Sequence, residues 1–190
     1  MRRRFVVYTD NWMVKQIETL YDDVTVVVID PVADVNSRKL MKFDLIDDFF
    51  RNNAASEYFS FIQSNCRCIS PVSAVELLHG HDIALNKSCW WEKSNCDSFM
   101  KYYCNTPGSV TFISKQKPGI PYLQAGHFIG KSQKIKILTN WITGAIKKDL
   151  SKNVHTKWHD ETYLNYYYHY VNGGAIDIAL ISGRTYLSGI

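Results

Sequence analysis

The sequence predicts an α/β fold in which a mixed, mainly parallel sheet is flanked by helices. Apolar, β-branched runs typical of strands alternate with longer segments that repeat apolar residues at helical spacing. The 190 residues contain neither an internal repeat nor a low-complexity linker. We therefore expect a single domain over residues 1–190.

The first half of the chain should contain three strands and one helix. The expected strands are runs rich in Val, Ile, Phe or Tyr at residues 5–10, 24–29 and 58–62. Asn36 and Ser37 open the helix, which ends near Asn52. One side of that helix repeats apolar residues and should face the core. These residues are Leu40, Phe43, Ile46, Phe49 and Phe50.

The second half should end in two helices and a strand. Residues 71–121 are rich in Cys, Asn and Trp and are expected to be irregular, and the glycines of residues 122–130 indicate a turn region. Ser132 is expected to cap the clearest helix of the chain. The further expected elements are a short strand at 110–113, a helix from Asp160 and a strand at 176–181.

Charge and composition argue against several classes of protein. The net charge is +4, but the lysines are scattered or lie beside one helix, which is typical of a solvated face, so we expect no nucleic-acid partner. No apolar run is long enough to span a bilayer, and no signal-peptide core follows the basic N-terminus. These observations predict a chain without a transmembrane segment, located in the cytoplasm.

Metal-binding and disulfide patterns are weak as well. The five cysteines include no C-x-x-C pair, which favours free thiols over a zinc site or a closed disulfide framework. His79, His81 and Asp82 are close in sequence, but no further ligands follow at a suitable spacing. We therefore expect no metal site.

The most informative stretch is Trp158-His159-Asp160-Glu161, which opens the last helix. The first turn of a helix has unpaired N–H groups and a partial positive charge, which favour carboxylates. These acids are therefore either ordinary helix-start acids or members of a site. The residues 63–65 form a second candidate region, because ligands of α/β folds bind beyond the carboxyl ends of strands.

Several separated stretches together resemble the family 6 retaining glycosyltransferases, which include the ABO blood-group transferases, the α1,3-galactosyltransferase and bacterial relatives. Residues 158–165 closely resemble the family signature Trp-His-Asp-Glu-Ser-His-Leu-Asn. Residues 5–10 are similar to its strand ending in Phe-Thr-Asp, Lys42-Phe43 to its Arg-containing helix, and residues 122–130 to its glycine-rich specificity loop. Order and spacing agree over roughly residues 5–182. The resemblance implies a GT-A fold.

The resemblance also implies an activity: transfer of galactose or N-acetylgalactosamine from a UDP-sugar to a galactose-type acceptor, through an α1,3 linkage and with retention of configuration. Glu161 would act as a nucleophile or as an electrostatic stabiliser of an oxocarbenium-like state. The other implied site residues are Asp160, His159, Gln124, Ala125 and Gly126 for the donor sugar, Lys42, Gln63 and Asn65 for the nucleotide and phosphates, and Trp158 for the acceptor. Without the resemblance, three of these residues fit structural roles equally well. Lys42 fits a solvated helix lysine, Asp160 fits an N-cap, and Trp158 fits a core residue.

The sequence departs from the family where vertebrate members carry Asp-x-Asp. Gln63, Ser64 and Asn65 stand there, and neutral amides lack the anionic oxygens that a divalent ion prefers. Bacterial relatives carry Asn-x-Asn and work without metal, so the resemblance implies a metal-independent enzyme without a cofactor. The matching stretches begin after the first strand–helix unit of the family, which we expect the fold to lack. The alternative is a catalytically inactive relative that serves as a glycan-binding or protein-interaction module.

Overall fold

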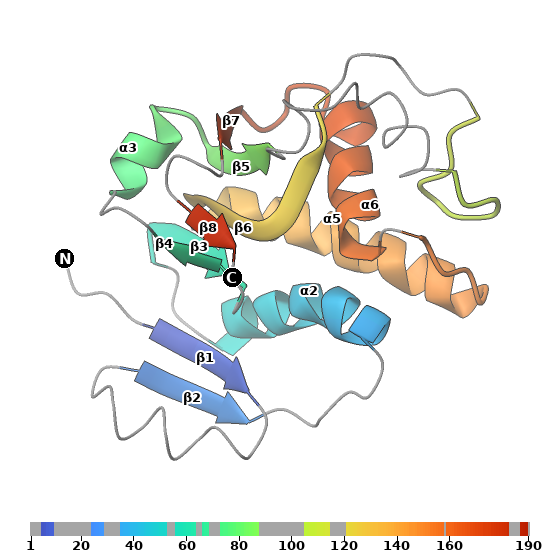
Figure 1. Ribbon diagram of the computed structural model, residues 1–190, viewed down its shortest axis with the longest axis horizontal. Coiled ribbons are helices and arrows are strands. Elements are labelled where there is room, and N and C mark those ends of the chain that lie inside the picture. Colours follow the sequence, from blue (N-terminus) through green and yellow to red (C-terminus); the bar gives the residue numbers. More distant parts are fainter. Residues whose placement is uncertain are drawn as a thin grey trace.

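The computed structural model describes residues 5–9, 24–28, 35–52, 56–63, 66–68, 73–87, 105–114, 121–157, 159–182 and 187–189. Its centre is a four-stranded sheet with the strand order β3–β6–β5–β7 (Figure 1). These strands are β3 (Tyr58–Ile62), β5 (Ile83–Lys87), β6 (Leu123–Lys131) and β7 (Ile178–Ser182). The α/β class is confirmed, and so are the strands expected at 58–62 and close to 176–181.

The strand directions differ from the prediction. β6 runs antiparallel to both of its neighbours, β3 and β5, and the parallel pairing in this sheet is between β5 and β7. The described sheet is therefore mixed but not mainly parallel. Alternation of strands and helices along a chain does not set strand direction, because a long connection can return the chain to either end of a neighbouring strand.

Two smaller strand pairs accompany the central sheet. β1 (Phe5–Thr9) and β2 (Val24–Val28) pair in parallel, which confirms the first two predicted strands. Their sheet lies beside one end of the α2 helix, and the Tyr8 hydroxyl donates to the carbonyl oxygen of Leu45 on α2 over 3.2 Å (Figure 1). β4 (Cys66–Cys68) and β8 (Leu187–Gly189) pair antiparallel.

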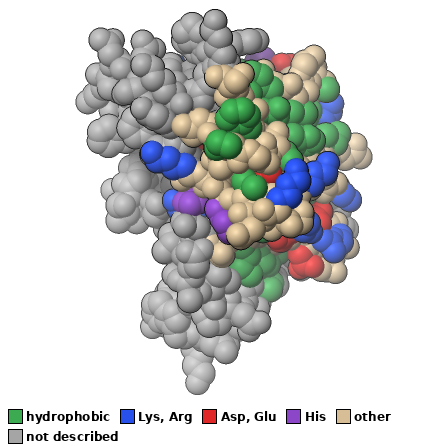
Figure 2. All heavy atoms as spheres, turned by 90° about the vertical axis from the view of Figure 1, so that its right-hand side faces the viewer, with side chains coloured by type: hydrophobic (Ala, Val, Ile, Leu, Met, Phe, Trp, Pro, Cys, Tyr) green, Lys and Arg blue, Asp and Glu red, His purple; other side chains and the backbone are tan. Residues whose placement is uncertain are grey.

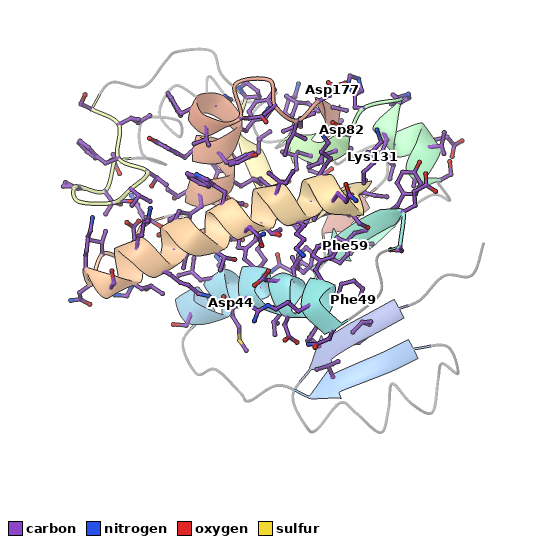
Figure 3. The ribbon with its side chains drawn as sticks, turned by 180° about the vertical axis from the view of Figure 1, so that it is seen from behind. Asp44, Phe49, Phe59, Asp82, Lys131 and Asp177 are labelled. Atoms are coloured by element: carbon purple, nitrogen blue, oxygen red, sulfur yellow. The ribbon has the colours of Figure 1, made fainter. Side chains whose placement is uncertain are left out.

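Helices cover both faces of the central sheet. α2 (Val35–Asn52), α5 (Ser132–Ser151) and α6 (His159–Tyr166) pack on one face, where α5 crosses the molecule above α2 in Figure 3. The short α3 (Ala74–Leu78) packs on the other face. α6 continues directly into a π-helical segment, η3 (Tyr167–Val171). The three helices expected from the sequence are confirmed.

The main core lies between the sheet and α2, α5 and α6. Phe43 and Ile46 of α2 are buried in it, as the apolar pattern of this helix predicts. The rings of Phe49 on α2 and Phe59 on β3 lie against each other with centroids 5.4 Å apart, and Figure 3 shows both at the same end of α2. Residues of the core that are fully covered include Ile83, Leu85, Leu123, Ile135, Leu138 and Ile142.

Within residues 71–121, the described segment 73–87 is more regular than expected. Ser73 and Glu76 form a capping box that starts α3, and β5 is buried between β6 and β7. The strand expected at 110–113 is wrong, because this segment is a turn. The backbone N–H of Val110 donates to the carboxylate of the buried Asp149 over 2.8 Å, so a side chain takes the bond that a neighbouring strand would need.

The glycine-rich residues 122–130 form most of β6 rather than a turn region. Gly130 is needed for close packing, because a Cβ there would lie 2.8 Å from the carbonyl oxygen of Asp82 and 2.9 Å from a side-chain carbon of Ile83. The expected cap of α5 is also wrong. Lys131 occupies the N-cap position without a side-chain hydrogen bond, and Ser132 is the first helical residue.

Charged side chains do not gather in one patch on the face shown in Figure 2. Lysines and arginines are scattered there among acidic and neutral side chains, whereas hydrophobic side chains gather in its upper half. Within the described ranges, no helix combines the length and the apolar character that crossing a bilayer requires.

Replacement of Gly130 by alanine should lower the free energy of unfolding by about 1–3 kcal/mol, because the backbone of Asp82 cannot move away from the added methyl group without disturbing β5. Urea unfolding measures this change. Gly144→Ala is the matched control: nothing lies within 4 Å of a Cβ at this exposed helix position, so the substitution should stabilise by about 0.5–1 kcal/mol. Equal effects at the two positions would contradict the close-packing role of Gly130.

Candidate active site

The candidate site is built around the first turn of α6. His159, the first residue of this helix, has a left-handed backbone with φ of 47°, and its N–H donates to the carbonyl oxygen of Thr156 over 3.3 Å. Asp160 and Glu161 follow in the first turn, where free N–H groups and the helix dipole favour carboxylates. Both carboxylates have partners on other elements, so they do more than start the helix.

Asp160 forms a buried ion pair with Lys42 of α2. The two residues are 5% and 7% exposed. The Lys42 ammonium also donates to the carbonyl oxygen of Ala125 over 2.8 Å and lies 5.4 Å from the ring centroid of Phe61. Lys42 is therefore not a solvated helix lysine. Its charge holds α2, α6 and β6 together at one point.

Glu161 faces a different set of groups. The Tyr122 hydroxyl donates to its carboxylate, and so does the backbone N–H of Ala125. Burial raises the pKa of Glu161 above its ordinary value, and the charge of Asp160 adds to this; the bonds from Tyr122 and Ala125 and the charge of Lys42 act in the opposite direction. The carboxylate is thus desolvated but supplied with donors, which suits a group that must act as an anion.

Asn165 fixes α6 against β6. It is fully buried, its side-chain oxygen accepts from the N–H of Leu123 over 2.9 Å, and its amide nitrogen donates to the Leu123 carbonyl oxygen over 2.9 Å. The same nitrogen donates to the Glu161 carbonyl oxygen over 2.8 Å. These bonds set the position of Glu161 relative to the strand.

A bulge in β6 shapes the strand at this place. Leu85 of β5 pairs with Phe128 of β6, but the next residue, Asn86, pairs with Gln124. Residues 125–127 are therefore extra on β6, and such a bulge re-aims side chains. Ala125 and Phe128 both face the main core as a result, although a regular strand would place residues at this spacing on opposite faces.

The structure thus brings together most of the residues that the sequence predicts for the site. Lys42, Ala125, Asp160 and Glu161 are joined by the contacts described above, and the N–H of Gln63 donates to the carbonyl oxygen of Gly126 over 2.8 Å. Gln124 adjoins this group on β6 and is half-buried. Ser64, Asn65 and Trp158 lie outside the described residues, so the roles predicted for them stay predictions.

Two members of the site were not predicted from the sequence. Asn165 could have been found, because it lies four residues after Glu161 and therefore on the same side of the helix. Tyr122 opens the stretch that resembles the specificity loop, but its contact with Glu161 could not be predicted, because 39 residues separate the two positions.

Two cavities flank α2 on different sides. The first, of about 540 Å³, lies between β1, α2 and β3; Lys42 and Gln63 line it together with the aromatic residues Tyr8, Phe49 and Phe59. We call it the β1–β3 cavity. The second, of about 320 Å³, lies between α2, α5 and the start of α6, and His159 lines it. The structure therefore places His159 apart from the cavity that Lys42 and Gln63 share.

A second polar cluster on β3, β5 and β6 resembles a nucleophile–base pair but does not fit one. His127 is buried, which lowers its pKa to about 4, and its Nε2 lies 3.5 Å from the hydroxyl of Ser60. The amide nitrogen of Asn86 donates to its Nδ1 over 3.1 Å, so the proton of the neutral ring is on Nε2. This tautomer donates toward Ser60 and cannot take its proton.

The cluster around Asp82 is likewise engaged in structural contacts. Asp82 accepts from Lys131 over 2.8 Å, and the bond from Lys131 lowers its pKa to about 2. His81 pairs with Asp177 over 2.8 Å, and Figure 3 shows Asp82, Lys131 and Asp177 together at one end of the sheet. In the described part of the chain, no three potential metal ligands gather in one group.

Breaking the buried ion pair should be costly because each single substitution leaves an uncompensated charge. We expect Lys42→Met and Asp160→Asn each to lower the free energy of unfolding by about 3–5 kcal/mol. The double variant should lose less than the sum of the two, since no buried charge is left alone. Chemical denaturation of all four proteins measures the cycle, and losses that simply add would show that the two groups do not depend on each other.

In a comparison with known families, the model of glycosyltransferase family 6 matches residues 5–175 of the chain. The matched range includes α2, β3, β6 and α6 and thus every described residue of the candidate site. A search of curated proteins found no match.

Proposed function

Because the chain belongs to glycosyltransferase family 6, we propose that it is a retaining enzyme that transfers galactose or N-acetylgalactosamine from a UDP-sugar to a galactose-type acceptor. The linkage formed would be α1,3, and the reaction would need no metal ion. The family supports glycosyl transfer from a sugar donor to an acceptor. The observation that carries the proposal is the Glu161 carboxylate, desolvated yet held by two hydrogen-bond donors at the first turn of α6.

Glu161 is the group best suited to the reacting carbon. Glycosyl transfer passes through a state in which positive charge develops at the anomeric carbon, and a nearby carboxylate stabilises that charge. If Glu161 attacks instead, it bonds to the anomeric carbon while the bond to the UDP oxygen breaks and UDP leaves with the electron pair. The acceptor oxygen then displaces the carboxylate, and its proton passes to the departing UDP or to solvent. Two inversions give retention.

The β1–β3 cavity is the proposed place of the nucleotide. Its volume of about 540 Å³ falls within the range of small-molecule sites. The rings of Tyr8, Phe49 and Phe59 offer flat apolar surfaces to a base, and Lys42 and Gln63 lie where the diphosphate would need a positive charge and hydrogen-bond donors. A bound diphosphate would compete with Asp160 for Lys42, which would release the Asp160 carboxylate toward the hydroxyl groups of the donor sugar.

The proposal of metal independence rests on the chemistry of the side chains at the end of β3. Gln63, the described residue there, offers a neutral amide, whereas Mg²⁺ and Mn²⁺ prefer anionic oxygens. The two carboxylates of the described site, Asp160 and Glu161, face Lys42 and Tyr122. Lys42 would supply the positive charge that a metal ion supplies elsewhere.

One observation favours the alternative of an inactive relative that binds glycans or proteins. Asp160 is 5% exposed and its carboxylate faces Lys42, so in this arrangement it is not open to a sugar. The two functions differ in a simple measurement. An enzyme releases UDP when a donor and a galactoside are both present, whereas an inactive relative binds a glycan without releasing UDP.

Glu161→Gln should lower kcat by about 10²–10³-fold, because the amide keeps the shape of the side chain but removes the charge that stabilises the transition state. The measurement is UDP release from UDP-galactose and UDP-N-acetylgalactosamine with a galactoside acceptor. Donor affinity, measured by calorimetry, should stay within a few-fold of wild type. Absence of donor binding by the wild-type protein would contradict the proposal that the protein is a glycosyltransferase with catalytic activity.

Chelation should leave UDP release unchanged, and added manganese should not increase it, because Lys42 rather than a metal ion would meet the diphosphate. The same release assay, run with EDTA and then with excess manganese, measures this. A manganese-dependent enzyme of the same reaction class serves as the assay control. Loss of activity on chelation, restored by manganese, would refute metal independence and leave the transfer itself intact.

A further inference from the structure

We propose that Tyr122 is a positioning residue for glycosyl transfer, whose hydroxyl holds the Glu161 carboxylate aimed at the reacting carbon. The proposal rests on the role of Glu161 given above. Tyr122 lies immediately before β6 and is 8% exposed, and its hydroxyl donates to Oε2 of Glu161. One oxygen of the carboxylate is thereby occupied by a donor, which fixes how the group is turned.

The position of Tyr122 is fixed from both sides. The ring of His169 on η3 bonds through Nε2 to the carbonyl oxygen of Pro121 over 2.9 Å. On the other side, Asn165 bonds both backbone groups of Leu123. Asn165 also donates to the backbone carbonyl oxygen of Glu161, so one buried side chain holds the backbone next to Tyr122 and the backbone of Glu161 in register. Such a supported contact is what a catalytic group needs to stay in a productive orientation.

A phenol is a suitable partner because it donates a hydrogen bond to the carboxylate without neutralising the negative charge. Asp160 is paired with the cation of Lys42, whereas Glu161 receives its hydrogen bond from a neutral group. An ordinary tyrosine stays protonated throughout the physiological range and therefore remains a donor. When Glu161 is ionised, its negative charge is therefore not balanced by a directly paired cation and is available to the developing positive charge at the anomeric carbon. Two neighbouring carboxylates thus receive different partners, one a cation and one a neutral donor.

Removal of the hydroxyl should change the ionisation of Glu161 in a defined direction. The groups that face this carboxylate are Asp160 from α6, Lys42 from α2, and Tyr122 and the Ala125 N–H from β6 and its start. Burial and Asp160 raise the pKa of Glu161, and the other three groups lower it. Without the hydroxyl, one of the effects that lower the pKa of Glu161 is lost, so this pKa should rise. At a given acidic pH, a larger fraction of Glu161 should then be protonated.

The test is a comparison of wild type with Tyr122→Phe in protein labelled with carbon-13 at the glutamate carboxyl groups. Loss of one resonance in Glu161→Gln identifies the signal of Glu161. We expect its titration midpoint to lie at higher pH in Tyr122→Phe. The acid limb of the kcat/KM profile should move in the same direction, with activity roughly tenfold lower on that limb and within a few-fold of wild type at higher pH.

Tyr167→Phe is the matched control, because it removes a hydroxyl from a similarly buried tyrosine, 4% exposed, whose ring lies against Trp141. It should leave the Glu161 titration unchanged. An unchanged midpoint in Tyr122→Phe, or a loss of activity that is equal at every pH, overturns the proposal. Full activity of Glu161→Gln would refute the proposed role of Glu161. The carboxyl titration does not depend on enzyme turnover, so it tests the effect of Tyr122 on Glu161 even in that case.

Discussion

The junction between α6 and β6 is the constraint on which the rest of the site depends. Asn165 satisfies both backbone groups of Leu123 and the carbonyl oxygen of Glu161 with one buried amide. The helix cannot slide or rotate against the strand without leaving these polar groups buried and unpaired, which is costly. Since Tyr122 and Ala125 lie on the same stretch of chain, the partners of Glu161 are positioned by the same junction.

The two adjacent acids of α6 have different surroundings because their partners come from different parts of the fold. Asp160 meets a cation on α2, so its charge is balanced and the pair links three elements. Glu161 meets a phenol and a backbone N–H, which favour its anionic form against the burial that raises its pKa. This contrast in partners supports the proposed division of roles, in which Glu161 faces the reacting carbon and Asp160 takes a structural or sugar-positioning role.

Much of the fold could be predicted from local patterns, and the misses have clear physical causes. Strands β1, β2 and β3 and helices α2 and α5 follow from apolar runs or apolar periodicity, whereas α6 is indicated by the acids that open it. β5 was missed because its burial between two strands leaves no alternation to read. The glycines of β6 predict a turn, because glycine indicates turns in general. In the structure, Gly130 instead allows close packing, and the bulge of β6 is set by its pairing with β5.

The sequence by itself determined the family and the candidate site residues: the acids at the start of α6, the lysine on α2, and the amide after β3. These features are local, since residue type and spacing along one helix or strand are enough to reveal them. Only the tertiary structure decided which partner each acid receives. Lys42 and Asp160 are far apart in sequence, as are Tyr122 and Glu161, and long-range contacts of this kind depend on how strands pair and helices pack, which no local pattern encodes.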